Sequence, residues 1–228
     1  EPELLSHLSV LRDSELIYER GLYPHSTCVF KHALTRQVVY DSIMVKRRKK
    51  LHEEIGNVIE EVYQDNLDEH YAVLAQQYIK SENCLKGIEY SIKAGDQSVG
   101  VFAWHEARNH YENALQILED DNTVQRAEIF RKLAMVTMSD LDVETSLDYA
   151  QNALRLYEAL EDKHYQLEVL MHIQSIYLGG FRDGSMEDEA LKYLEKAAAI
   201  VEKESDNQDK GLIYQRTAHL YLHRGQPA

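Results

Sequence analysis

The sequence predicts an all-α protein whose helices pair into hairpins and stack into a superhelix, preceded by a small segment with a β-hairpin. Gly and Pro together account for only 13 of 228 residues, which favours long helices over a turn-rich sheet. Small residues recur at intervals of 39 to 44 residues, the length of two helices and their turns. Residues 1–52 hold nine Lys and Arg against six Asp and Glu, whereas residues 53–228 hold sixteen against thirty-three. This shift in charge predicts a boundary between a first segment, residues 1–46, and the repeats, residues 47–228.

The first segment predicts a helix, a β-hairpin and a second helix, in that order. Pro2 suits the first turn of a helix, where its missing N–H needs no partner. Residues 14–20 and 26–31 are rich in strand-forming residues and flank a turn that contains Pro24. Thr35 is placed to cap a further helix that runs to about Val45. The end of a winged helix has this order, so we expect a winged-helix remnant.

The rest of the chain predicts four helical hairpins and one unpaired terminal helix. Small residues stand at equivalent places: Gly56, Gly95 and Ala134 in first helices, and Ala75, Ala114, Ala153 and Ala197 in second helices. Antiparallel helices approach closely only where one of them lacks bulk, so these places predict the contacts within each hairpin. The expected helices span residues 48–63, 67–80, 84–101, 104–119, 123–139, 143–160, 163–178, 187–203 and 209–223.

This pattern resembles the tetratricopeptide repeat. The best single match is residues 107–114, which read Ala-Arg-Asn-His-Tyr-Glu-Asn-Ala. The period exceeds the family's usual length of about 34 residues, so the units are similar to its longer-helix variants in signalling ATPases. The resemblance covers residues 48–224 and implies a right-handed solenoid with a concave, partner-binding groove.

A second resemblance concerns residues 15–21 (Glu-Leu-Ile-Tyr-Glu-Arg-Gly) and 30–35 (Phe-Lys-His-Ala-Leu-Thr), followed by Val39-Tyr40, Arg47-Arg48, Leu51-His52 and Ile55-Gly56. In order and spacing they resemble the junction in signal-transduction ATPases, often fused to class III adenylate or guanylate cyclases, where a winged-helix-like module leads into tetratricopeptide repeats. The resemblance implies a multidomain cytoplasmic regulator with its nucleotide-binding and cyclase domains upstream. This chain would then be a non-catalytic sensing or autoinhibitory arm.

Other functions stay open at this point. One is a free-standing tetratricopeptide scaffold or adaptor, and another is a DNA-binding regulator that uses the hairpin. The net charge of −14 argues against general affinity for nucleic acid. In related ATPases a winged-helix histidine contacts the nucleotide phosphate, and His32 is the candidate for that contact. The alternative for His32 is a structural histidine at a strand-to-helix corner.

The first helix of each unit is expected to line the concave groove. The predicted partner-binding residues are Glu89, Ile92, Asp96, Val99, Glu128, Arg131, Met135, Met138, Glu168, Met171, Ser175 and Leu178. The equivalent positions of the first helix are Lys50, Glu53, Asn57 and Glu60 in the first unit, and Leu212, Gln215, His219 and Leu222 in the last. Glu89, Glu128 and Glu168 would repel a terminal carboxylate. A groove lined by methionines, with acidic residues at its edges, therefore predicts a basic, amphipathic or extended protein segment as the partner.

Motifs for catalysis, cofactors or metals are weak. Residues 179–185 contain three glycines but lack the lysine of a P-loop. His105 and His110 are five residues apart, which is wrong for one zinc ion, and His219 and His223 have no evident third ligand. The run of basic residues 46–50 is followed by glutamates, which favours a solvated helix face or a domain-junction patch. We expect no enzymatic activity, cofactor or metal.

The cysteines and the end of the chain lead to two further expectations. Cys28 and Cys84 are far apart, which is typical of a reducing cytosol, and no apolar run approaches the length of about 20 residues that a membrane span needs. The fifth unit stops after one helix, so the chain looks cut from a longer array. Exposure of Ile213, Leu220 and Tyr221 then predicts end-to-end self-association through residues 209–224.

Overall fold

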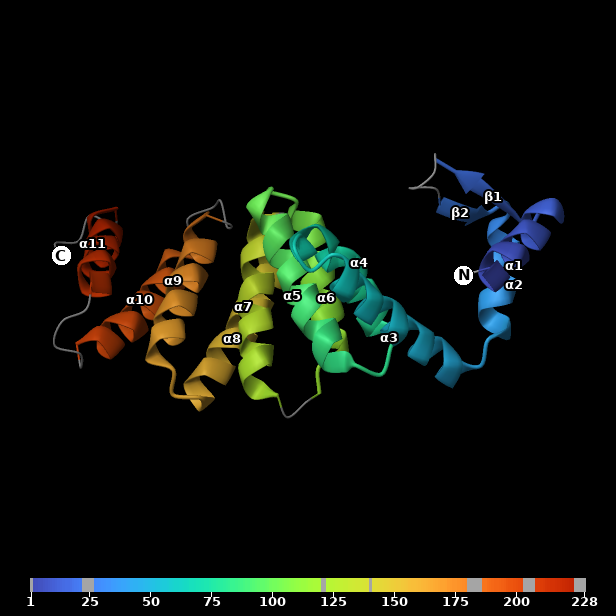
Figure 1. Cartoon of the computed structure of the whole chain (residues 1–228). Helices are drawn as coiled ribbons and strands as arrows, with labels where there is room; N and C mark the ends of the chain where they lie inside the picture. The colour runs from blue at the N-terminus through green and yellow to red at the C-terminus, as the bar shows by residue number, and fades with distance from the viewer. Residues whose placement is uncertain are drawn as a thin grey trace.

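The computed structural model describes residues 2–21, 27–119, 122–139, 141–179, 186–202 and 208–223. The chain forms a row of helices in sequence order, in which each helix packs mainly against its neighbours in the chain (Figure 1). The predicted fold class is confirmed: an all-α, tetratricopeptide-like stack of helical hairpins, preceded by a small two-stranded sheet. None of the described helices is both long and apolar enough to cross a lipid bilayer.

The N-terminal segment has the predicted order of elements. Helix α1 (Pro2–Asp13) is followed by strands β1 (Ile17–Arg20) and β2 (Thr27–Phe30), which pair antiparallel with Ile17 opposite Phe30, and then by helix α2 (Ala33–Ser42). The predicted turn around Pro24 lies outside the described residues.

The predicted cap and end of the second helix are wrong. Helix α2 begins at Ala33, because the His32 backbone is extended and its carbonyl accepts a hydrogen bond from the Arg36 N–H at 3.2 Å. Thr35 therefore lies inside the first turn instead of capping the helix. The helix also stops at Ser42, because the backbone of Ile43 is extended.

The repeat helices lie within three residues of their predicted bounds. They are α3 (Val45–Val62), α4 (Tyr71–Ile79) with the preceding 3₁₀ helix η1 (Leu67–His70), α5 (Cys84–Gly100), α6 (Trp104–Ile117), α7 (Thr123–Ser139), α8 (Val143–Ala159), α9 (Lys163–Gly179), α10 (Glu187–Val201) and α11 (Gln208–His223). Residues 180–185, between α9 and α10 in the sequence, lie outside the described part of the chain. Side-chain oxygens cap the starts of α5, α8 and α9: Asn83 accepts from the N–H of Lys86 at 3.3 Å, Asp142 from that of Thr145 at 3.3 Å, and Asp162 from that of Tyr165 at 3.2 Å.

The small residues lie where the helices approach most closely. A Cβ atom on Gly95 would be 2.3 Å from Cε1 of Tyr111, and one on Gly56 would be 2.7 Å from Cζ of Tyr78. The four alanines predicted for the second helices, Ala75, Ala114, Ala153 and Ala197, are all buried. The core therefore runs between the helices along the whole stack, and each unit completes the core of its neighbour.

Candidate peptide-binding groove

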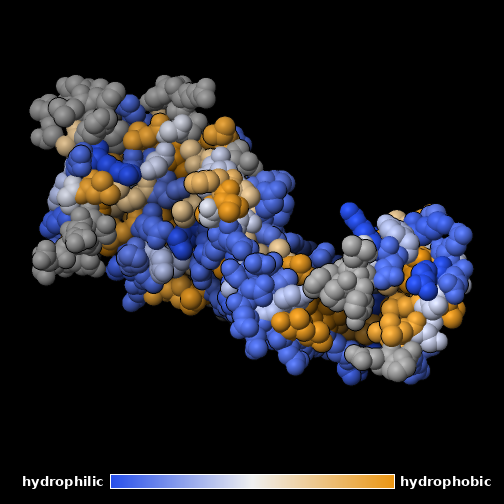
Figure 2. Space-filling view, turned by 45° about the horizontal axis from the view of Figure 1, so that its top comes forward, coloured by the Kyte–Doolittle hydropathy of each residue, from blue (hydrophilic) through white to orange (hydrophobic). Residues whose placement is uncertain are grey.

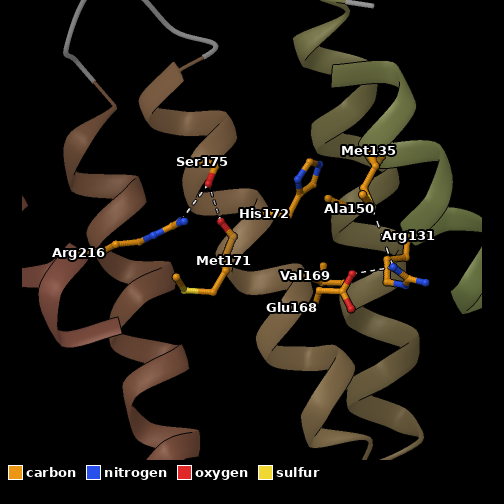
Figure 3. A pocket seen from close by; sticks show the side chains of 10 residues that line it. Arg131, Met135, Ala150, Glu168, Val169, Met171, His172, Ser175 and Arg216 are labelled. Atoms are coloured by element: carbon orange, nitrogen blue, oxygen red, sulfur yellow. Dashed lines mark hydrogen bonds and ion pairs between the residues drawn. The ribbon is translucent and has the colours of Figure 1, made fainter. Parts of the chain in front are cut away.

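Two adjoining cavities lie along the first helices of the units. One has a volume of about 230 Å³ and is lined from α7, α8, α9 and α11 (Figure 3). The other has a volume of about 400 Å³ and is lined from α5, α6, α7 and α9. Arg131, Met135 and His172 line both cavities, so together they form one groove. The groove contains eight of the predicted residues: Asp96, Val99, Arg131, Met135, Met138, Glu168, Met171 and Ser175.

The other four predicted residues lie outside both cavities. Glu89 is exposed and pairs with Lys93 on its own helix at 2.6 Å. Ile92 packs against the core between α5 and α7, and Leu178 is exposed at the end of α9. The Glu128 carboxylate lies 3.9 Å from the ammonium group of Lys132.

The wall of the larger cavity is mostly apolar. Val99, Met135 and Met138 contribute aliphatic and thioether surface, and Trp104 and Val136 complete it. Methionine side chains adapt to different shapes, which suits a site that takes up side chains of a partner.

Charged side chains cross the groove in pairs. Arg131 on α7 donates to Oε1 of Glu168 on α9 at 2.6 Å, and its guanidinium carbon lies 5.1 Å from the centre of the Tyr165 ring. Lys132 donates to Oδ1 of Asp96 on α5 at 2.6 Å. The same carboxylate accepts from the Tyr111 hydroxyl at 2.6 Å. Burial and then this bond to Asp96 raise the pKa of Tyr111.

A column of basic residues on the first helices of the units was not among the predicted groove residues. Lys93, Lys132, His172 and Arg216 recur at steps of 39, 40 and 44 residues, each two residues before the equivalent of the small position in its helix. Two members reach back to equivalent residues of the preceding unit: Lys132 to Asp96, and Arg216 to Ser175 at 3.1 Å (Figure 3). These basic residues recur at the same period from which the helices were predicted, so the column could have been found in the sequence.

His172 occupies the middle place of this column. Its Nε2 atom is buried and has no hydrogen-bond partner among the described residues. Burial lowers the pKa of the imidazole, so His172 is neutral at neutral pH. Arg216, which lines the same cavity, donates to Oε1 of Gln174 at 2.8 Å. The groove is therefore mixed in charge, and its acidic side chains are partly neutralised.

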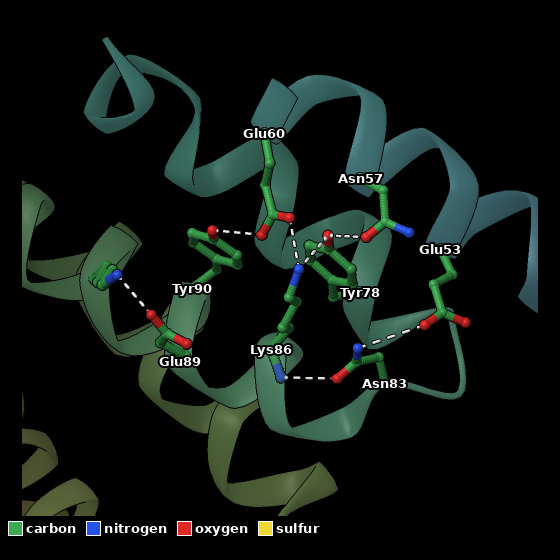
Figure 4. A network of polar contacts seen from close by, with 9 residues as sticks. Glu53, Asn57, Glu60, Tyr78, Asn83, Lys86, Glu89 and Tyr90 are labelled. Carbon is green, nitrogen blue, oxygen red and sulfur yellow. Dashed lines mark hydrogen bonds and ion pairs between the residues drawn. The ribbon is translucent and has the colours of Figure 1, made fainter. Parts of the chain in front are cut away.

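The predicted groove residues of the first unit are held in a polar network (Figure 4). Glu60 accepts from Lys86 Nζ at 2.5 Å and from the Tyr90 hydroxyl at 2.6 Å. Asn57 accepts from the Tyr78 hydroxyl at 2.9 Å. Burial opposes ionisation of Glu60, but the hydrogen bonds from Lys86 and Tyr90 lower its pKa. These side chains are therefore engaged by residues of α4 and of α5, the first helix of the next unit, and so differ from the open groove between α5 and α9.

The remaining predicted residues have simpler surroundings. His32 is exposed at the corner between β2 and α2, and its contact with a nucleotide-binding domain stays a prediction. Leu212 and Gln215 are exposed on α11, whereas the side chains of His219 and Leu222 lie outside the described part of the structure. Within the described residues, no group of three His, Cys, Asp or Glu side chains is placed to hold a metal ion.

Neither a protein-family model nor a curated protein matches this sequence. Solved structures with a similar course of the chain include BtubC from P. vanneervenii, with 18% identity, a TM-score of 0.49, and coverage of 81% of this chain and 85% of that one. A STAND protein with a tetratricopeptide repeat sensor from Pyrococcus horikoshii has 18% identity and a TM-score of 0.47 over 97% of this chain, which spans 31% of that protein. MamA has 18% identity and a TM-score of 0.42, covering 75% of this chain and 94% of its own.

Proposed function

We propose that this chain is a non-catalytic protein-interaction module that holds a segment of a partner protein in the groove between α5, α7 and α9. The observation that carries the proposal is the continuous pair of cavities around Arg131, Met135 and His172. Concave sites with an apolar wall and a few placed polar groups are the usual form of binding sites.

The side chains of the groove suit an amphipathic or extended segment. Apolar side chains of the segment would enter the cavity beside Met135 and Met138. Basic side chains would compete with Arg131 for Glu168 and with Lys132 for Asp96, because both ion pairs reach the solvent. Exchange of one exposed ion pair for another costs little, so the apolar contacts supply most of the affinity.

In its biological setting, we place the module as the regulatory arm of a cytoplasmic signalling ATPase or nucleotidyl cyclase. The support is the resemblance of residues 15–56 to the junction of such proteins. The bound segment would then belong to the parent's own catalytic part, and binding would be autoinhibitory. The second candidate is a free-standing adaptor with the same groove. Upstream genomic sequence separates the two, because only the first requires a P-loop there.

The test uses amphipathic 20-residue peptides, basic on the polar face in one set and acidic in the other. Met135→Glu places a charge in the groove, and Val73→Glu on α4 is a matched control outside both cavities, since the two side chains are 46% and 45% exposed. We expect Met135→Glu to weaken binding of the basic set at least tenfold, because the lost apolar contact and the charge placed in the cavity outweigh its attraction for basic side chains. Val73→Glu should leave binding unchanged. Equal binding by both variants would show that the groove is not the site.

A second variant tests the acidic side chains. Reversal of Glu89, Glu128 and Glu168 to Lys is expected to abolish binding of the basic set, chiefly through Glu168, since Glu89 and Glu128 lie outside both cavities. Each glutamate has a cationic neighbour, at 2.6 Å for Lys93, 3.9 Å for Lys132 and 2.6 Å for Arg131. The reversal therefore also lowers stability, and the triple Gln variant serves as the control that removes the charges without adding repulsion.

A further inference from the structure

The turns at the tips of two adjacent hairpins hold a large apolar residue in a left-handed backbone conformation. The φ angle is 60° at Phe102, between α5 and α6, and 63° at Leu141, between α7 and α8. In the first turn the N–H of Phe102 donates to Val99 O at 3.0 Å, and that of Ala103 to Ser98 O at 2.9 Å. The second turn has the same two bonds. This is the Schellman motif, in which glycine is the usual residue at the left-handed position.

Neither burial in the core nor backbone preference explains these two side chains, although the Phe102 ring makes an edge-to-face contact with Trp104, with 5.6 Å between the ring centres. Phe102 is 75% exposed and Leu141 is 79% exposed, so neither is part of the core. The left-handed conformation is unfavourable for a residue with a Cβ atom. Strained residues of this kind concentrate at functional sites, where another contact favours the side chain. The two residues are 39 positions apart, so they occupy the same place in consecutive units.

The other units continue this row. Tyr63 lies 39 residues before Phe102, at the end of α3, and is also exposed. Val101, next to Phe102, is exposed as well. Phe181 lies 40 residues after Leu141 in the sequence, outside the described residues. We call Tyr63, Val101, Phe102 and Leu141 the hairpin-tip row. Its turns lie along the upper edge of the stack in Figure 1, and Figure 2 brings that edge forward.

Acidic residues predominate around the hairpin-tip row, although Arg108 of α6 pairs at 3.1 Å with Asp142, the residue next to Leu141. Helices α6, α8 and α10, which begin at this edge, have Glu106, Glu144 and residues 187–189 in their first turns. Helices α3, α5, α7 and α9, which end there, have no basic residue in their last turn. The helix dipole favours acid at these starts, but it does not account for apolar side chains between them.

The opposite edge of the same hairpins provides a contrast. Leu85 and Val124 are exposed there and are also 39 residues apart. The first turns of α5 and α7, in which they lie, contain no acidic residue. Of these two edges, as far as the structure describes them, the one with Phe102 and Leu141 combines a strained backbone, exposed apolar side chains and acidic helix starts.

We propose that the hairpin-tip row docks a basic amphipathic helix of a partner protein, at a site separate from the concave groove. The apolar face of that helix covers Phe102 and Leu141, and its Lys and Arg residues face Glu106 and Glu144. Charge complementarity selects this occupant. An anionic lipid surface and a second copy of this chain would both bring negative charge to the same edge.

The test uses a labelled 18-residue helical peptide with Leu on one face and Lys on the other, and a twin in which Glu replaces Lys. The double variant Phe102→Gly and Leu141→Gly removes the apolar side chains and relaxes both turns. We expect it to weaken binding of the Lys peptide at least tenfold, measured by fluorescence anisotropy, while it raises Tm by about 2 °C for each substitution. The Glu twin should not bind.

Glu161→Gly is the matched control for the backbone. Glu161 has a φ of 56°, and its turn has the same pair of hydrogen bonds: the N–H of Glu161 donates to Glu158 O and that of Asp162 to Tyr157 O. This turn lies after α8, at the opposite edge. It should raise Tm in the same way and leave binding unchanged. The double variant Leu85→Ala and Val124→Ala controls for the loss of exposed apolar surface, and should also bind normally.

Several results would overturn the proposal. One is undiminished binding by the Phe102 and Leu141 variant, and another is a fall in its Tm, which would give the side chains a structural role. If Met135→Glu alone abolished binding, the peptide would be shown to bind in the groove and not at the hairpin-tip row. Binding of vesicles with 30% anionic lipid, or self-association in sedimentation that the double variant removes, would assign the row to another occupant.

Discussion

The repeat stack and the N-terminal segment bury their apolar side chains to opposite degrees. In the stack, Leu74, Ile129 and Leu194 are fully buried, and every first and second helix from α3 to α10 has a buried residue. Among the described residues of 2–46, Ile17 alone is buried, whereas Leu34 is 80% exposed. Hydrophobic residues accordingly gather at the surface of the N-terminal end, on the right in Figure 2. A repeat unit buries its apolar face on the next unit, but a segment of this length has too little surface to build its own core.

A short chain of hydrogen bonds and an ion pair between Arg48 on α3 and Asp41 on α2, at 3.1 Å, join the two regions. The Tyr40 hydroxyl on α2 lies 2.9 Å from Nε2 of His52 on α3, and Nδ1 of His52 lies 2.7 Å from Oε1 of Gln77 on α4. The guanidinium group of Arg48 lies 4.8 Å from the centre of the Tyr40 ring. Polar contacts therefore connect the regions where an apolar interface is lacking.

The stack is expected to show the two largest effects, and the first comes from a methyl group added where two of its helices touch. Gly95→Ala would place Cβ 2.3 Å from the Tyr111 ring, which is buried and held by Asp96 at 2.6 Å. Because the ring has no space to move, we expect a loss of about 2–3 kcal/mol in the free energy of unfolding, measured in urea. Gly100→Ala, on the same helix with no atom within 4 Å of its Cβ, is the control and should not lower stability.

Leucine truncation compares the two regions directly. Leu194→Ala in α10 removes a fully buried side chain and should cost about 2–5 kcal/mol. Leu34→Ala in α2 removes an exposed one and should change the free energy of unfolding by less than about 0.5 kcal/mol. Similar losses of stability in the two variants would mean that Leu34 is part of a core in the N-terminal segment, which would contradict the comparison.

The same comparison explains which helices could be predicted accurately from the sequence and which could not. The repeat helices were predicted to within three residues because Gly56, Gly95 and their equivalents mark a contact that every unit repeats. No repeat constrains α2, so Thr35 was taken for its cap although the extended backbone of His32 starts the helix earlier. Of the predicted groove residues, eight line the two cavities, and their role in binding stays a prediction. Pairs such as Arg131 with Glu168 join residues of different helices, and their distance cannot be derived from the register of one helix.

A smaller effect is expected at the link between the regions. Tyr40→Phe removes the hydrogen bond to His52 and should lower the stability of the chain by about 0.5–1.5 kcal/mol. Because the link is local, the loss should be confined to the N-terminal end. Hydrogen exchange tests this: amides of α2 should exchange faster in the variant, and those of α7 and α8 should be unchanged. Faster exchange throughout would mean that the N-terminal segment supports the whole stack.

The smallest effect is expected from acid, and it tests whether the polar network of the first unit stabilises the stack. Hydrogen bonds from Lys86 and Tyr90 lower the pKa of Glu60 below its ordinary value of 4.5. The unfolded chain therefore binds a proton more readily than the folded one, and stability rises with pH across that window. This contribution is complete above about pH 4.5 and is lost as the pH falls through the lowered pKa of the folded state. Glu60→Gln cannot titrate, so its Tm should fall less steeply than that of the parent between pH 5 and pH 3. Parallel Tm curves for the two proteins would show that the bonds of Lys86 and Tyr90 to Glu60 give the stack no net stability.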